Sequence, residues 1–68
     1  MGSQEEISKA LKKGRKEMKL TQLQVAEKVN VSVNYYARIE RGEVSPSLET
    51  LKDLMKILKI KSLKISTP

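Results

Sequence analysis

One short segment concentrates polar side chains that can hydrogen-bond to flat molecular edges. It runs from Thr21 to Gly42, and its second half carries Ser32, Asn34, Tyr35, Arg38 and Arg41. Asn amides and Arg guanidinium groups form paired hydrogen bonds with adenine and guanine, and an apolar side chain such as that of Val33 can contact a thymine methyl. These residues are candidates for base recognition, unless they form only the solvated face of a helix.

The composition argues against catalysis. The chain has 68 residues and contains neither His nor Cys, which removes the commonest general base, the thiolate nucleophile and the usual zinc ligands. It also lacks a Gly-rich phosphate loop and a cluster of carboxylates. We therefore expect neither an enzyme nor a protein that holds a metal or another cofactor.

The charge indicates the kind of partner. The 14 Lys and Arg residues outnumber the 8 Asp and Glu residues, which gives a formal charge of +6. Such an excess in a small domain favours a polyanion such as double-stranded DNA, although a Lys-rich surface that only maintains solubility is the simpler alternative. Because no apolar run approaches the ~18 residues of a membrane span, we expect no membrane partner and a location in the cytoplasm, associated with the nucleoid.

Periodicity and capping residues predict an all-α fold, a bundle of four to five helices in one domain of residues 1–68. Thr21, Ser32 and Ser47 are the expected N-caps. The alternating residues 29–35 are also typical of a strand, but a lone strand would have no partner, so we prefer a turn followed by a helix. The expected helices cover 3–18, 21–28, 32–41 and a stretch from 47, within a core of about 4–60 and before a tail of 61–68.

Apolar residues at helical spacing predict which faces point inward. In the third helix Tyr36 and Ile39 face the core, which leaves the polar residues around them on the outer faces. The Tyr36 hydroxyl is expected to reach the surface from a buried ring, unless the ring changes how the helix is seated. The fourth helix is expected to bury the stripe Leu48, Leu51, Leu54 and Leu58.

The second and third helices have the proportions of a helix-turn-helix unit. Such a unit places its second helix in the major groove, with the N-terminal residues of that helix facing the base edges. Gln22, at the start of the first helix of the pair, is then positioned to donate to a DNA phosphate.

Several short motifs also recur in a characteristic order. They are Arg15, Leu20-Thr21-Gln22, Val25-Ala26, Asn30-Val31-Ser32, Ile39-Glu40-Arg41-Gly42 and Pro46-Ser47-Leu48-Glu49-Thr50-Leu51. Together they resemble the lambda-repressor-like helix-turn-helix family, which contains the phage repressor/Cro proteins and the Xre-type regulators. The similarity extends over roughly residues 7–60.

The resemblance implies a five-helix domain that binds operator DNA, usually as a two-fold dimer. By position, it implies a phosphate contact for Gln22 and a second backbone contact near Arg41. It implies base-reading or groove-facing positions for Ser32, Val33, Asn34 and Arg38. Arg15 and Glu40 match a pair that forms a partly buried salt bridge in the family, so we expect this pair to be structural.

The sequence departs from the family pattern at a few positions. Lys19 and Lys59 replace Gly at two helix ends, and we expect other closures there. Tyr35 is expected either to be simply exposed or to contact DNA or a partner. Leu63 and Ile65, in the tail, are expected either to pack on the domain or to form a dimer seam.

Two functions remain open from the sequence. The first is a small transcriptional regulator of the repressor or antitoxin type that reads operator half-sites with the helix at 32–41. The second is a protein-interaction module on the same fold, with a partner such as a toxin or a polymerase subunit and only weak nonspecific DNA binding. In the second case Val33, Tyr35 and Tyr36 would contact the partner.

Overall fold

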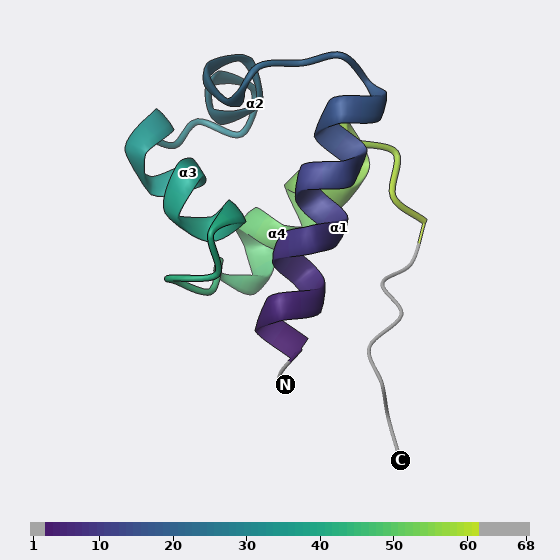
Figure 1. The fold of residues 1–68 in the computed structure, drawn as a ribbon. Coiled ribbons are helices and arrows are strands. Elements are labelled where there is room, and N and C mark those ends of the chain that lie inside the picture. Colours follow the sequence, from purple (N-terminus) through teal and green to yellow (C-terminus); the bar gives the residue numbers. More distant parts are fainter. Residues whose placement is uncertain (1–2, 62–68) are drawn as a thin grey trace.

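A computed structural model describes residues 3–61, which form four helices. These are α1 (Ser3–Glu17), α2 (Gln22–Lys28), α3 (Val33–Glu40) and α4 (Leu48–Ile57) (Figure 1). The described range contains no strand, so the all-α prediction is confirmed and residues 29–35 form a turn followed by a helix. The tail beyond Lys61, including Leu63 and Ile65, and any fifth helix there lie outside the described residues.

The predicted N-caps begin three of these helices. The Thr21 hydroxyl accepts a hydrogen bond from the backbone N–H of Gln24 at 3.0 Å. In return, the side-chain oxygen of Gln24 accepts one from the backbone N–H of Thr21 at 2.8 Å, which completes a capping box. The Ser32 hydroxyl accepts from the amide of Tyr35 at 3.0 Å, and Ser47 caps α4 in the same way. Because each cap satisfies an amide that lacks a partner within its helix, the starts of α2, α3 and α4 are fixed locally.

All four helices end in the same left-handed turn. At the end of α1, Lys19 has a φ of 59°, and the Leu20 amide donates back to the Arg15 carbonyl at 3.1 Å. Asn30, Gly42 and Lys59 occupy the corresponding positions after α2, α3 and α4, each with positive φ. The expectation of a different closure at Lys19 and Lys59 was therefore wrong, because these lysines adopt the conformation that Gly usually provides.

The core lies where the four helices meet. Its fully buried side chains are Leu11, Val25, Ala26, Tyr36, Ile39, Leu54 and Leu58. A Cβ at Gly14 would lie 3.2 Å from Ile60 Cδ1, so Gly14 permits close packing of α1 against the segment that follows α4. The prediction that Leu48 is buried was wrong: this first residue of α4 is 70% exposed, because the apolar stripe extends past the edge of the core.

The packing leaves α3 at one side of the molecule. α3 packs against α2 and α1, and α2 also packs against α4. In Figure 1 α1 lies in front, α2 at the top and α3 at the left, and among the helices of residues 3–61 none is drawn on the outer side of α3. No helix within residues 3–61 is long and apolar enough to cross a bilayer.

Candidate nucleic-acid interface

The outer face of α3 carries most of the candidate base-reading residues. Ser32, Val33, Asn34 and Arg38 are all exposed, while Tyr36 and Ile39 are buried on the opposite face. Asn34 and Arg38 are four residues apart and therefore neighbour each other along one side of the helix. Tyr35 is partly buried and packs against the core, which limits its availability for contact.

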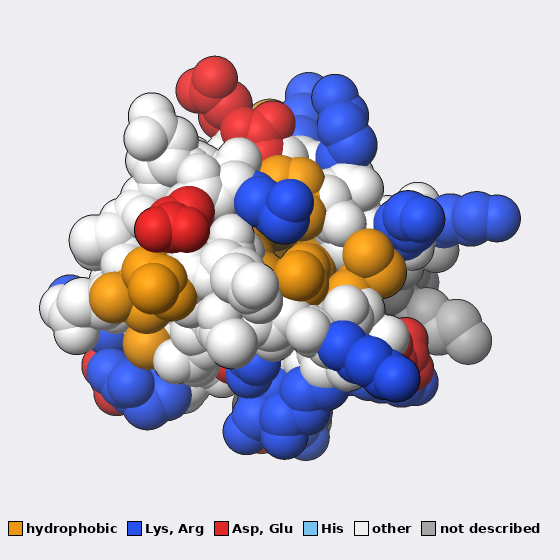
Figure 2. All heavy atoms as spheres, turned by 90° about the horizontal axis from the view of Figure 1, so that it is seen from above, with side chains coloured by type: hydrophobic (Ala, Val, Ile, Leu, Met, Phe, Trp, Pro, Cys, Tyr) orange, Lys and Arg blue, Asp and Glu red, His pale blue; other side chains and the backbone are white. Residues whose placement is uncertain are grey.

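Basic side chains are spread over the surface around the helix-turn-helix unit and on α1. Figure 2 shows the molecule from above, on the side where α2 lies, with Lys and Arg side chains more numerous than acidic ones and small hydrophobic patches between them. Leu23 on α2 is 52% exposed and was not singled out from the sequence. On α1, Lys9, Lys12, Lys13 and Lys16 border one shallow, open surface region and add to the positive charge.

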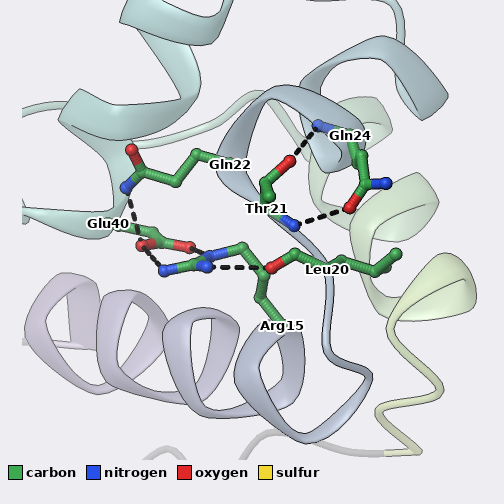
Figure 3. Close-up of polar contacts among 6 residues, drawn as sticks. All are labelled: Arg15, Leu20, Thr21, Gln22, Gln24 and Glu40. Carbon is green, nitrogen blue, oxygen red and sulfur yellow. Dashed lines mark hydrogen bonds and ion pairs between the residues drawn. The ribbon is translucent and has the colours of Figure 1, made fainter.

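A buried ion pair joins α1 to α3. The Arg15 guanidinium donates from Nε to Glu40 Oε2 at 2.7 Å and from Nη2 to Glu40 Oε1 at 3.1 Å, and its Nη1 donates to the Leu20 carbonyl at 3.0 Å (Figure 3). The Arg15 side chain is 13% exposed and that of Glu40 only 3%. Two-point contact of this kind is the strong form of a carboxylate–guanidinium pair.

The surroundings shift the pKa values of both partners. The hydrogen bond to Glu40 raises the pKa of Arg15. Burial alone would raise the pKa of Glu40, but hydrogen bonds to its carboxylate outweigh burial and lower the pKa below its ordinary value. Glu40 is therefore charged in the folded protein at neutral pH, although it is buried.

Gln22 connects the start of α2 to the same carboxylate. Its Nε2 donates to Glu40 Oε1 at 3.0 Å, as Figure 3 shows. An amide nitrogen has two hydrogens, so this bond leaves one of them for another acceptor. Glu40 thus fixes the orientation of the Gln22 amide, and sequence spacing gave no signal of this contact because the two residues belong to different helices.

The Tyr36 hydroxyl is buried beside Glu40 without a well-formed hydrogen bond. The expectation that the hydroxyl reaches the surface was therefore wrong. Burial, followed by the neighbouring Glu40 carboxylate, raises the pKa of Tyr36 far above its ordinary value. The phenol stays neutral and acts as a core side chain whose polar end is poorly satisfied.

Two arginines at the end of α3 share one acidic residue. Glu43 accepts hydrogen bonds from Arg41 Nε at 2.7 Å and from Arg38 Nε at 3.4 Å. The hydrogen bond from Arg41 lowers the pKa of Glu43. Sequence reasoning missed Glu43; the signal for it was the glycine before it, because the positive φ of Gly42 turns the chain back toward α3.

The fold and this exposed helix face define a class of protein. Two short helices joined by a tight turn, with polar side chains on the outer face of the second, form a helix-turn-helix domain. The family model described as Helix-turn-helix matches residues 11–65, and the chain belongs to that family. It is a family of DNA-binding regulators rather than of enzymes, and the resemblance seen in the sequence is confirmed.

A curated relative matches part of this domain. The chain is 52% identical over 46 residues to an immunity repressor protein of Bacillus phage phi105. The matched segment covers 68% of this chain and 32% of the repressor, so the chain spans about a third of the length of that relative. The search of solved structures gave no match.

Proposed function

We propose that the chain binds a specific sequence of double-stranded DNA and acts as a small transcriptional regulator of the repressor or antitoxin type. The observation that supports this most is the outer face of α3, where Asn34 and Arg38 are exposed. Tyr36 and Ile39, on the opposite face, are buried in the core and anchor the helix. In this proposal α3 enters the major groove, and Ser32 and Val33 near its start approach the base edges.

Phosphate contacts position the helix in the groove. Gln22 donates its second amide hydrogen to a phosphate, Arg41 contacts the backbone near the end of α3, and the excess of Lys and Arg provides affinity that does not depend on sequence. A single module of this size binds weakly, so we propose a homodimer that reads two half-sites about 34 Å apart. A role of this kind places the protein in the cytoplasm, on the nucleoid.

The test is selection of duplexes from a random pool at about 150 mM salt, a concentration at which purely electrostatic binding is weakened. We expect enrichment of an inverted repeat with half-sites one helical turn apart. Enrichment of a single half-site would remove the dimer from the proposal. If no sequence is enriched, the proposal fails, and the interaction of this fold with a partner protein becomes the function to examine.

A further inference from the structure

The acidic residue just after α3 engages both arginines at the end of that helix. Glu43 Oε2 accepts from Arg41 Nε at 2.7 Å, and Glu43 Oε1 accepts from Arg41 Nη2 and from Arg38 Nε, each at 3.4 Å. We infer that Glu43 determines specificity at the proposed DNA interface, by orienting Arg38 and by weakening attachment to DNA of arbitrary sequence. The inference rests on the proposed function.

Glu43 leaves the two terminal nitrogens of the Arg38 guanidinium available. The contact uses only Nε of the Arg38 guanidinium, and within residues 3–61 its two terminal nitrogens make no hydrogen bond. These terminal nitrogens are a pair of donors that can bind both acceptors of a guanine. A carboxylate at Nε therefore limits the rotation of the side chain while its outer end remains exposed.

Glu43 acts differently on Arg41. It occupies the edge formed by Nε and Nη2, which is one of the edges that a guanidinium offers to a phosphate. A phosphate that uses this edge must displace Glu43, whereas the end edge formed by Nη1 and the second hydrogen of Nη2 stays available. The charge of Glu43 also repels a phosphate directly, so the cluster of two arginines and one glutamate attracts DNA less than two free arginines would.

These two effects differ between operator and nonspecific DNA. Nonspecific binding depends almost entirely on neutralising phosphates, and Glu43 opposes it. Binding to the operator adds base contacts, and Glu43 supports these through the orientation of Arg38. Glu43 therefore lowers nonspecific affinity more than operator affinity and raises the ratio between them.

The exposure of the cluster makes the inference testable without unfolding the domain. The side chains of Arg38, Arg41 and Glu43 are 46%, 54% and 46% exposed, and none belongs to the core. Glu43→Gln keeps the shape of the side chain and removes its charge. Glu17→Gln is the matched control, because Glu17 is an exposed residue at the C-terminal end of α1 and carries the same charge.

Thermal unfolding first verifies that wild type and both variants are folded. The experiment then measures the affinity of each protein for the selected duplex and for a scrambled duplex of the same length. The measurements are made at salt concentrations from about 50 to 150 mM. For Glu43→Gln, we expect affinity for the scrambled duplex to rise about tenfold at 50 mM and about fourfold at 150 mM, since removing one opposing charge steepens the salt dependence by about one. Affinity for the selected duplex should rise less than about twofold, because lost orientation of Arg38 offsets the gain. Glu17→Gln should leave the ratio of the two affinities unchanged.

Three results would overturn the inference. Equal gains on both duplexes would show that Glu43 acts only as a charge, and unchanged affinities would show that it does not act on binding. If the ratio of selected-duplex to scrambled-duplex affinity falls as much in Glu17→Gln as in Glu43→Gln, the effect belongs to net charge. In all three cases wild type still prefers the selected duplex, so the proposed function stands. If wild type binds neither duplex, both the proposed function and the inference about Glu43 are overturned.

Discussion

Arg15 donates to both carboxylate oxygens of Glu40, a residue 25 positions later in the chain, and so joins the first helix to the third. Both side chains are almost completely removed from water. A buried pair of this kind adds little when it is compared with apolar residues of the same size, but the loss of one partner leaves a buried charge without compensation.

Replacing Arg15 with Met should therefore destabilise the domain strongly. We expect a loss of about 3 kcal/mol in the free energy of unfolding, measured by urea denaturation at pH 7. The double variant Arg15→Met, Glu40→Gln should be less destabilised than the sum of the two single variants. Lys9→Met is the control, since its pair with Glu5 is exposed and should matter little. Additive effects of the two buried substitutions would contradict this account.

Stability should decrease in acid because of Glu40. The pKa of Glu40 is lower in the folded chain than its ordinary value of 4.5, so the unfolded chain takes up the proton first as the pH falls. The stabilisation from Glu40 is complete above pH 4.5 and is lost as the pH falls through the lower, folded pKa. Unfolding free energies measured across this range should fall steeply in wild type and less steeply in Glu40→Gln. A parallel decline in the two proteins would assign the acid sensitivity to other carboxylates.

Removing the Tyr36 hydroxyl should stabilise the fold. The hydroxyl is buried and poorly bonded, and a buried polar group without a partner costs about 1 to 3 kcal/mol. We expect Tyr36→Phe to raise the free energy of unfolding by about 1 kcal/mol, because the ring keeps its packing while the unsatisfied oxygen is lost. Tyr35→Phe, at a partly buried position, is the comparison and should change little. Destabilisation of Tyr36→Phe would show that the hydroxyl supports Glu40 after all.

Arg38→Ala should affect the selected duplex much more than other DNA. We expect a loss of about 1 to 3 kcal/mol on the selected duplex, the range for a good base contact. On a scrambled duplex the loss should match that of Lys13→Ala, which removes one exposed positive charge from the outer face of α1. Fluorescence anisotropy titrations with both duplexes measure the difference. An equal loss on the two duplexes would exclude Arg38 from base recognition.

The elements of the fold were predictable because their determinants are local. Thr21, Ser32 and Ser47 are caps with recognisable neighbours, and the helices follow from apolar spacing over a few turns. Leu48 was misplaced because periodicity identifies the inner face of a helix but not where the core ends along it. Lys19 and Lys59 were misjudged because the hydrogen bonds that close these turns come from Leu20 and Ile60, which pack against the core and so favour a positive φ that a lysine seldom adopts alone.

The composition of the candidate interface was predictable in part. The exposed residues of α3 follow from its buried ones, since a helix with two anchored positions has a defined outer side. The bond from Gln22 to Glu40 was not predictable, and for the bond from Arg38 to Glu43 the sequence offered only the turn residue Gly42 as a signal. Each depends on how the chain is folded around a turn or between helices, and several side-chain pairings are compatible with the same spacing.

The shared carboxylate of Glu40 has a consequence for genetic screens. Under the proposed function, a library scored only for loss of regulation should return Arg15 and Glu40 together with Asn34 and Arg38, because an unfolded protein and a folded one without the proposed base contacts would give the same phenotype. Cellular protein level separates the two groups, since the first is expected to be degraded and the second to accumulate normally. Substitutions at Gln22 should show some of both behaviours. One hydrogen of its side-chain amide bonds to Glu40 and supports the fold, and the other remains for another acceptor.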